Sequence, residues 1–407
     1  MQDEPPCFEQ TLTSLKTGTA VRLAQCGPGV AWLFEQSLSK SDIPSARDLL
    51  TLAQQRLRIY HYDRVPACWR YLYTDATLLL ACARCKTANR DESWHAETVR
   101  LLDMAIIVAG AEDREPLIFA LMRFVQQSLV HDIHDTPAKR PGKRRKVDQP
   151  DLTRPIELLD RMPLFMPKQP RVVRNGCSDW PACIQWPDLS YLSRKAGPAR
   201  VIPVEVGGSY TQDDWTQRIM PFDDFLCAIA SEDVKADKLY LAQHDLFRQI
   251  PELRDDIIVP DVVFSAPQAP DHLPSYHPPM NELQYSLNAW FGPAGTLSPA
   301  HTDPYFNCYI QVAGRKQVWI APPSLNSRDM HCFDSSVDVD EAGQTALMTN
   351  TSRVNVFDET SLPVGFDRAR NLSQEAILNS GDVLLLPPGW WHAFRSLTTS
   401  HSVSIWF

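Results

Sequence analysis

The chain has 407 residues, which is room for about two or three domains and for a hydrophobic core that needs no disulfide or metal to support it. Hydrophobic residues make up 44% and charged residues 22%, as in ordinary folded proteins, and 16 glycines against 33 prolines exclude collagen-like and glycine-rich disordered chains. The net charge of −9 argues against binding of nucleic acid over the whole surface. We therefore expect no direct sequence-specific binding of nucleic acid.

A membrane-spanning segment is not expected, because no stretch of the sequence reaches the roughly 18 consecutive apolar residues that such a segment needs. The acidic and polar first residues lack the basic and apolar regions of a secretory signal. The ten cysteines are scattered, and one CxxC pair, Cys82 and Cys85, lies in an apolar helical context. Without a second pair nearby, buried free thiols are favoured over a zinc site, and a reducing compartment fits best.

The N-terminal third of the chain has the periodicity of helices. Apolar residues recur at spacings of three and four; the clearest runs are Val30, Leu33, Phe34 and Trp69, Leu72, Ala76, Leu79. Breakers such as Ile43–Pro44 separate the helices, and Ser39 or Ser41 is predicted to cap the helix that runs through residues 46–50. Because no catalytic cluster stands out, residues 1–135 are predicted to form a helical domain for packing or interaction.

A dense basic run follows the helical region. Residues 138–147 contain six basic and no acidic side chains, with prolines and a glycine in and around them. This composition is typical of a linker, which we place at residues 136–155. A solvated loop, a patch for nucleic acid and a nuclear import signal all fit the run; the import signal is favoured because such receptors recognise short, exposed cationic segments. The sequence therefore predicts a nuclear protein, with the cytoplasm as the alternative, and an import receptor as a partner.

After Leu159, short strand-like runs replace the helical pattern. They are separated by turn clusters, as in a β-barrel or sandwich. The runs are 201–206, 308–312, 317–321, 383–386 and 402–406. A double-stranded jelly roll suits these runs, so the fold class is predicted to be α+β, with a helical N-terminal domain and a C-terminal jelly-roll domain over residues 156–407.

One segment of the β region concentrates metal-binding chemistry. His301 and Asp303 are two residues apart, and on an extended strand such residues project to the same face. His392, which follows the apolar run 383–386, can supply a third ligand. Two imidazoles and one carboxylate that leave three positions open form the ligand set of non-haem Fe(II) oxygenases. On spacing alone the alternative stays open that His301 caps a turn and His392 packs beside two tryptophans.

A lysine in the next hairpin supports the metal interpretation. Lys316 lies thirteen residues after Asp303, between two strand-like runs. A lysine that points into a barrel is costly unless an anion pairs with it, and the distal carboxylate of 2-oxoglutarate is such an anion. The alternative is a surface position for Lys316 in the hairpin.

The sequence resembles a jumonji C domain through several motifs. These motifs are Asn288–Pro293, Ser298–Pro304, Asn307, Gln311–Lys316 and Trp391–His392. More narrowly, the chain resembles the branch of bifunctional peptidases and arginyl hydroxylases, which also share Pro203–Gly207, Tyr240–His244 and Ser402–Trp406. The resemblance covers about residues 170–407. It implies a double-stranded β-helix of the cupin type that uses Fe(II), 2-oxoglutarate as cosubstrate, and O2.

The resemblance also implies roles for individual residues. Fe(II) is expected on His301, Asp303 and His392. The distal carboxylate of 2-oxoglutarate is expected on Lys316, in a site lined by Tyr240, Ser298, Asn307 and Trp406. The substrate arginine is expected on Glu205, Tyr210, Trp215, Gln243 and Trp290. A glutamate can accept two hydrogen bonds from a guanidinium, and aromatic side chains offer faces on which it stacks. No catalytic residue beyond the metal ligands is expected.

The activity that the resemblance implies is hydroxylation of an arginine side chain in a protein, dependent on Fe(II) and 2-oxoglutarate. A histone lysine demethylase of the same family is the main alternative, although Glu205 favours a guanidinium over a methylammonium group. Peptidase activity has weak support, because no nucleophile–base pair is apparent. The third alternative is a non-catalytic β-barrel scaffold that binds a partner through its helical region.

Overall fold

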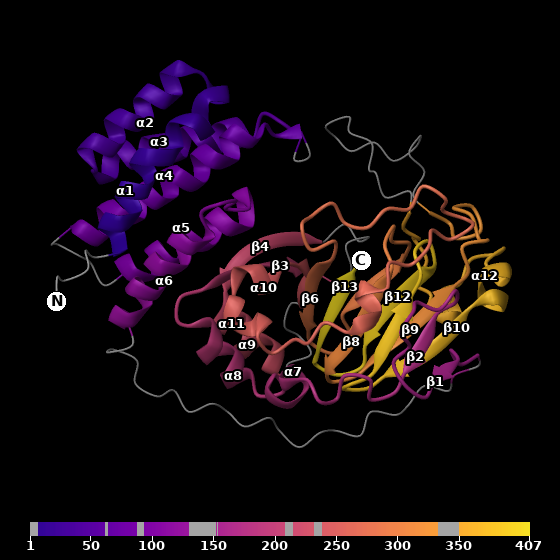
Figure 1. Cartoon of the computed structure of the whole chain (residues 1–407). Coiled ribbons are helices and arrows are strands. Elements are labelled where there is room, and N and C mark those ends of the chain that lie inside the picture. Colours follow the sequence, from indigo (N-terminus) through magenta and orange to yellow (C-terminus); the bar gives the residue numbers. More distant parts are fainter. Residues whose placement is uncertain are drawn as a thin grey trace. The chain divides into compact units, whose positions relative to one another are not determined.

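The computed structural model describes residues 7–61, 64–87, 93–129, 152, 154–207, 215–231, 238–332 and 350–407 (Figure 1). The chain forms two compact units. The helical unit consists of the described part of residues 1–138 together with residues 196–202 and 220–223. The barrel unit holds the other described residues. The basic run predicted to be a linker lies outside the described residues.

Helices α1 to α6 build the helical unit. Their bounds are α1 Cys7–Leu23, α2 Pro28–Lys40, α3 Ile43–Leu57, α4 Ala67–Lys86, α5 Trp94–Ala109 and α6 Glu115–Leu129. Helix α4 is the central element, because it contacts α1, α3, α5 and α6. It is accordingly buried around most of its circumference, with Thr74, Asp75 and Thr77 among its buried residues.

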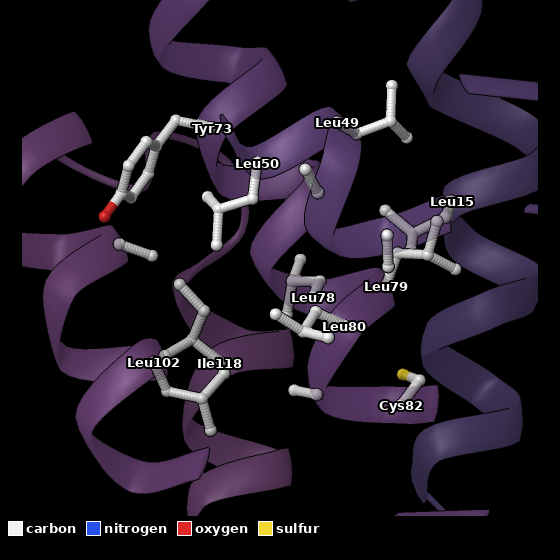
Figure 2. Close-up of a cluster of buried hydrophobic side chains, with 14 of the residues drawn as sticks. Leu15, Leu49, Leu50, Tyr73, Leu78, Leu79, Leu80, Cys82, Leu102 and Ile118 are labelled. Carbon is white, nitrogen blue, oxygen red and sulfur yellow. The ribbon is translucent and has the colours of Figure 1, made fainter. Parts of the chain in front are cut away.

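The core of the helical unit gathers on α4. Figure 2 shows Leu78, Leu79 and Leu80 of this helix among side chains of neighbouring helices, such as Leu15 and Leu102. The predicted stripe Trp69, Leu72, Ala76, Leu79 is buried. Burial of each large aliphatic side chain contributes about 1.5–3 kcal/mol. The two cysteines of the CxxC pair, Cys82 and Cys85, form no disulfide and are buried in the same helix.

The structure corrects two details of the helical prediction. Leu33 is exposed, because α2 turns Phe34, Ser37 and Leu38 toward the core instead. The predicted cap was also wrong: Ser41 ends α2 in a left-handed conformation, and Asp42 caps α3 by accepting a hydrogen bond from the Ser45 amide at 2.8 Å. The proline read as a breaker starts α3, since a proline in the first helical turn loses no hydrogen bond.

A buried carboxylate joins three elements of the helical unit. Asp75 of α4 is fully buried, and its Oδ1 accepts a hydrogen bond from Arg114 Nε at 2.9 Å. Its Oδ2 accepts one from the Thr19 hydroxyl at 2.9 Å and a longer one from Arg114 Nη2 at 3.4 Å. Both carboxylate oxygens are therefore occupied by groups of the protein itself.

Two sheets form the framework of the barrel unit. One has the strand order β1-β2-β11-β8-β13-β6-β5-β3-β4, and the other has the order β10-β9-β12-β7 (Figure 1). The strands are β1 Leu158–Leu159, β2 Arg171–Val173, β3 Val201–Val206, β4 Thr216–Pro221, β5 Leu239–His244, β6 Ser286–Gly292, β7 Leu297–His301, β8 Asn307–Ala313, β9 Lys316–Ala321, β10 Gln374–Leu378, β11 Val383–Leu386, β12 Trp391–Ser396 and β13 Ser400–Trp406. The predicted α+β fold class is confirmed.

Short helices accompany the strands in the C-terminal part of the chain. They are α7 Pro181–Gln185, α8 Leu189–Ala196, α9 Phe222–Ala230, α10 Leu246–Gln249, α11 Pro251–Arg254 and α12 Asp367–Leu372. The predicted runs 201–206 and 383–386 have the bounds of β3 and β11, and the other three predicted runs lie within β8, β9 and β13. Among the described residues, no helix combines the length and the apolar character that crossing a bilayer requires.

The turn between β8 and β9 is locked to the turn between β12 and β13. Gly314 has a φ of +76°, and a Cβ there would lie 2.1 Å from the backbone oxygen of Thr399. Arg315 reinforces the contact: its amide donates to Thr398 Oγ1 at 2.9 Å, and its carbonyl accepts from the Leu397 amide at 2.9 Å. Only glycine fits this close approach, which fixes where the following strand begins.

Candidate metal centre

Three potential metal ligands meet at one end of the four-stranded sheet. His301 ends β7 and His392 is the second residue of β12, and the two face each other in the antiparallel register of these strands. Asp303 lies two residues beyond β7. Its Oδ2 is 3.3 Å from His392 Nε2 and its Oδ1 is 3.7 Å from His301 Nε2. Among the described residues, this is the one group of three or more His, Cys, Asp or Glu side chains close enough to share a metal ion.

Hydrogen bonds to the backbone orient both imidazoles. His301 Nδ1 lies 2.8 Å from the Pro299 carbonyl, and His392 Nδ1 lies 3.0 Å from the Trp390 carbonyl. Because a carbonyl only accepts, each Nδ1 carries a proton, which leaves Nε2 as the ring atom that can offer a lone pair to a metal. Burial, followed by the neighbouring His392, lowers the pKa of His301, which keeps this imidazole neutral. Two imidazoles and a carboxylate are the donor set that suits Fe(II).

The structure changes one step of the sequence argument. Asp303 is not on the strand with His301, because β7 ends at His301 and the chain turns. The Gly389 amide donates a hydrogen bond to the Asp303 carbonyl at 2.8 Å and ties this turn to the segment before His392. The carboxylate therefore reaches the imidazoles from a turn rather than from the shared face of a strand.

A cavity extends from the three ligands into the barrel. Its lining is Tyr240, Trp290, Ser298, His301, Asp303, Asn307, Tyr309, His392 and Phe394. Lys316, the first residue of β9, is only 1% exposed, and its Nζ donates to the Tyr240 and Tyr309 hydroxyls at 3.1 and 3.0 Å. Within the described part of the chain no carboxylate forms an ion pair with this ammonium. Burial consequently lowers the pKa of Lys316 to about 7.

Other polar atoms beside the cavity also lack partners. Asn307 Oδ1 and Trp406 Nε1 are buried and form no hydrogen bond with a described residue. The two residues face each other across β8 and β13. Unpaired buried polar atoms are costly unless a ligand satisfies them. A small dicarboxylate fits these surroundings, because the buried ammonium and the unpaired Trp406 indole N–H can both donate to a carboxylate and the three metal ligands line the same cavity.

The residues predicted for 2-oxoglutarate come together around this cavity. Tyr240, Ser298 and Asn307 are among its lining residues. Lys316 contacts it through the Tyr240 hydroxyl, and Trp406 borders it beside Asn307. They come from β5, β7, β8, β9 and β13, so the closed sheet structure gathers residues from distant parts of the sequence.

The residues predicted for a substrate arginine are less closely grouped. Glu205 of β3 lies opposite Tyr240 of β5, and burial raises the pKa of its carboxyl group, which the Trp215 indole partly counters. Trp290 lines the cavity and donates a hydrogen bond to Ser404 at 3.0 Å. Gln243 is exposed at a bulge of β5, with a φ of +48°. The remaining predicted residue, Tyr210, lies outside the described residues.

Two cavity residues were missed in the sequence. Tyr309 contacts the Lys316 ammonium, and the Phe394 ring stacks on the Tyr309 ring at 4.3 Å. Tyr309 could have been predicted from strand alternation, since it lies two residues after Asn307 and therefore on the same face of β8. The same reasoning from His392 finds Phe394.

Comparison with known proteins agrees with this class of barrel. Residues 162–407 match the cupin-like domain family. Lysine-specific demethylase JMJ30 of Arabidopsis thaliana is 40% identical over 251 residues, which are 60% of this chain and 51% of that protein. Jumonji C domain-containing protein 5 of Drosophila melanogaster is 31% identical over 87% of this chain and 84% of the relative. Lysine-specific demethylase 8 of Danio rerio is 29% identical over 92% and 90%.

The fold and the ligand group define an oxygenase-type cupin barrel with an added helical unit. The chain belongs to the cupin-like family of jumonji C oxygenases. The matched region is only about half the length of the Arabidopsis relative, whereas it spans most of the Drosophila and zebrafish relatives.

Proposed function

We propose that the chain is an Fe(II)- and 2-oxoglutarate-dependent hydroxylase of protein arginine side chains. The observation that carries the proposal is the pairing of two features in one cavity. His301, Asp303 and His392 line the cavity, and the buried Lys316 ammonium, without a carboxylate partner among the described residues, donates to the hydroxyls of two other lining residues, Tyr240 and Tyr309. An ammonium so placed fits the distal carboxylate of a 2-oxo acid whose other end chelates the metal.

The side chains around the cavity would each contribute one physical task. Bound Fe(II), with 2-oxoglutarate and O2, supplies an oxidant strong enough to hydroxylate an unactivated C–H bond. The two imidazoles and Asp303 would hold the metal on one side and leave three positions open. Lys316 would neutralise the distal carboxylate, and the aromatic wall of Trp290 and Phe394 would keep bulk water from the reacting carbon.

The proposal of arginine as substrate rests on Glu205. Glu205 is half-buried opposite Tyr240 of the neighbouring strand, and it has no cationic partner among the described residues. A guanidinium is the side chain that best satisfies such a carboxylate, because it donates two parallel hydrogen bonds. The neighbouring Trp215 and Trp290 would offer stacking faces.

Demethylation of methyl-lysine is the second candidate, and the names of the Arabidopsis and zebrafish relatives favour it. Mass spectrometry separates the two after incubation of arginine and methyl-lysine peptides with Fe(II) and 2-oxoglutarate. We expect the arginine peptide to gain one oxygen and the methyl-lysine peptide to stay unchanged. Loss of a methyl group would favour the demethylase instead. Absence of metal-dependent succinate with any peptide would favour a scaffold.

We also propose nuclear localisation through the basic run at 138–147, in the linker between a helical domain and the oxygenase domain. Replacement of Lys143, Arg144, Arg145 and Lys146 with alanine should move a tagged protein from nucleus to cytoplasm and leave the activity of the purified protein unchanged. An unchanged distribution would contradict an import signal.

A further inference from the structure

We infer that His272 is a positioning residue of the metal site: it holds the peptide group between Pro388 and Gly389 in the orientation that anchors Asp303. The inference rests on the proposed function, and it adds to the metal site a residue from outside the ligand motifs. His272 belongs to the proline-rich segment 265–285, which precedes β6 in the barrel unit.

A single peptide group connects His272 to Asp303. Its carbonyl oxygen, that of Pro388, lies 2.9 Å from His272 Nε2. Its amide, that of Gly389, donates a hydrogen bond to the Asp303 carbonyl at 2.8 Å. Because a carbonyl only accepts, His272 Nε2 must carry a hydrogen and donate it. The peptide is planar and trans, so its oxygen and its hydrogen point in opposite directions, and His272 and Asp303 hold it from opposite sides.

The turn that contains this peptide has an alternative form. Pro388 and Gly389 are its central residues, and Gly389 has a φ of +76°. A proline followed by a glycine with positive φ is typical of a type II turn. In a type I turn the central peptide is rotated by about half a turn, which would direct the Gly389 amide away from Asp303. The bond from His272 favours the observed form, because a rotated carbonyl would no longer accept it.

The imidazole also packs directly on the turn. A Cβ on Gly389 would lie 2.9 Å from His272 Nε2 and 3.2 Å from its Cδ2. Glycine is therefore required at this position both by the positive φ and by the contact with the imidazole. A hydrogen bond to the carbonyl of a peptide also polarises its amide, so the donor from His272 strengthens the bond from Gly389 to Asp303.

A second contact fixes the segment that carries His272. The Tyr276 hydroxyl donates to the backbone oxygen of Phe407, and the Tyr276 ring meets the Phe306 ring edge-on at 5.0 Å. Pro388 precedes β12 of the four-stranded sheet, whereas Phe407 follows β13 of the nine-stranded sheet. The segment therefore links the two sheets beside the turn that carries Asp303.

Asp303 needs such support because it lies in a turn and not on a strand. The residue before it, Thr302, is held by Asn350: the Thr302 amide donates to the Asn350 carbonyl at 3.1 Å, and the Thr302 carbonyl accepts from Asn350 Nδ2 at 2.9 Å. The Gly389 amide holds the backbone of Asp303 itself. Loss of His272 should therefore weaken the metal site without abolishing it.

His272→Ala and His272→Gln test the inference in the full chain, with Co(II) alone as the probe. The visible absorption of Co(II) depends on the number and geometry of its ligands, so one titration reports both affinity and coordination. We expect His272→Ala to bind Co(II) about tenfold more weakly and with an altered spectrum, as for other residues that support a metal ligand. His272→Gln keeps an N–H donor at a similar reach and should recover most of the affinity and the parent spectrum.

Hydrogen exchange of the metal-free chain provides a readout that needs no metal. The Gly389 amide should exchange faster in His272→Ala than in the parent, whereas amides in the middle of β12 should be unchanged. Because His272 is exposed, its replacement disturbs no core packing, and the melting temperature should stay within about 2 °C of the parent.

His277→Ala is the matched control from the same segment. His277 is exposed, and its Nδ1 lies 3.2 Å from the carbonyl of the adjacent Pro278, so this variant should bind Co(II) like the parent. Parent-like binding by His272→Ala, or equal losses in His272→Ala and His272→Gln, would overturn the positioning role and leave the proposed function intact. A parent protein that binds no Co(II) would overturn the proposed function and the inference with it.

Discussion

Two buried charged groups, one in each unit, are held in opposite ways. Asp75 in the helical unit receives hydrogen bonds on both oxygens from Arg114 and Thr19. Lys316 in the barrel unit has no carboxylate partner among the described residues and donates to two neutral phenols, and burial lowers its pKa to about 7. A buried charge that the protein neutralises itself stabilises the structure only if the pair stays intact. A buried charge without an ionic partner indicates a place kept for a ligand.

The largest effect is expected at the metal ligands. Asp303→Ala leaves two imidazoles, too few protein donors to hold Fe(II), so turnover should fall at least a thousandfold with a circular dichroism melt close to that of the parent. His277→Ala, an exposed histidine of the same unit, is the matched control and should retain full activity. Turnover of Asp303→Ala near the parent rate would contradict the metal site.

At Asp75, the charge that the protein neutralises itself, the expected effect is a loss of stability. Asp75→Asn leaves the Arg114 guanidinium buried without its counter-charge, which should destabilise the helical unit by about 3–5 kcal/mol. Hydrogen exchange of the full chain should show faster exchange in α1, α4 and α6 and unchanged exchange in β8 and β12. The exposed Asp48→Ala serves as control and should stay within about 0.5 kcal/mol. Uniform loss of protection in both units would contradict the local role of Asp75.

Glu205→Gln tests the proposed binding of a substrate arginine beside the cavity. The change keeps the size of the side chain and removes its charge, so binding of an arginine peptide should weaken by about one to two orders of magnitude. Affinity for 2-oxoglutarate should stay unchanged, and so should peptide binding by the exposed control Glu359→Gln. If Glu205→Gln instead abolishes cosubstrate binding and spares the peptide, the arginine proposal loses its main support.

Removal of the charge at Lys316 should raise the stability of the folded protein, whereas removal of the charge at Asp75 should lower it. Lys316→Met removes a buried ammonium that the protein does not neutralise, so the ligand-free protein should melt several degrees higher at neutral pH. The same variant should lose measurable binding of 2-oxoglutarate. A lower melting temperature would mean that Lys316 already has a stabilising partner.

The pH dependence sharpens this prediction. The folded protein holds the pKa of Lys316 near 7, below its ordinary value of 10.5, so between these values the unfolded chain binds more protons. The burial cost is therefore complete below about pH 7 and fades as the pH rises. The difference in melting temperature between Lys316→Met and the parent should therefore shrink as the pH rises from about 7 to 10.5. Affinity for 2-oxoglutarate should fall over the same window, because the carboxylate needs the ammonium.

Local sequence patterns were sufficient to predict much of the secondary structure and part of the core. The strand runs and the buried face of α4 follow from hydrophobic periodicity, which depends only on neighbouring residues. For Lys316 the sequence left two positions open, inside the barrel with an anionic ligand or on the surface of the hairpin, and the structure buries it. The strand runs and the buried face of α4 were predictable because each is decided by chemistry within a few residues of the chain.

The features that could not be predicted from the sequence depend on contacts between distant segments of the chain. Asp303 reaches the imidazoles from a turn that the Gly389 amide holds, a contact between segments more than eighty residues apart. The exposed position of Leu33 depends on how α2 turns against its neighbours. Tyr309 was overlooked because its hydroxyl gains a role only when β8 and β9 bring it to Lys316.

The locked turn at Gly314 has a consequence for how the protein is made. Its neighbour Thr399 belongs to the turn before β13, and β13 lies between β8 and β6 in the middle of the large sheet. Gln311 and Ser402, which meet across this pairing, are 91 residues apart. During translation, β6 and β8 leave the ribosome before β13, the strand that pairs with both of them, and such long-range pairing is slow. The nascent barrel therefore exposes unpaired strand edges until residues 400–406 emerge, and a chaperone that protects such edges would raise the yield of folded protein.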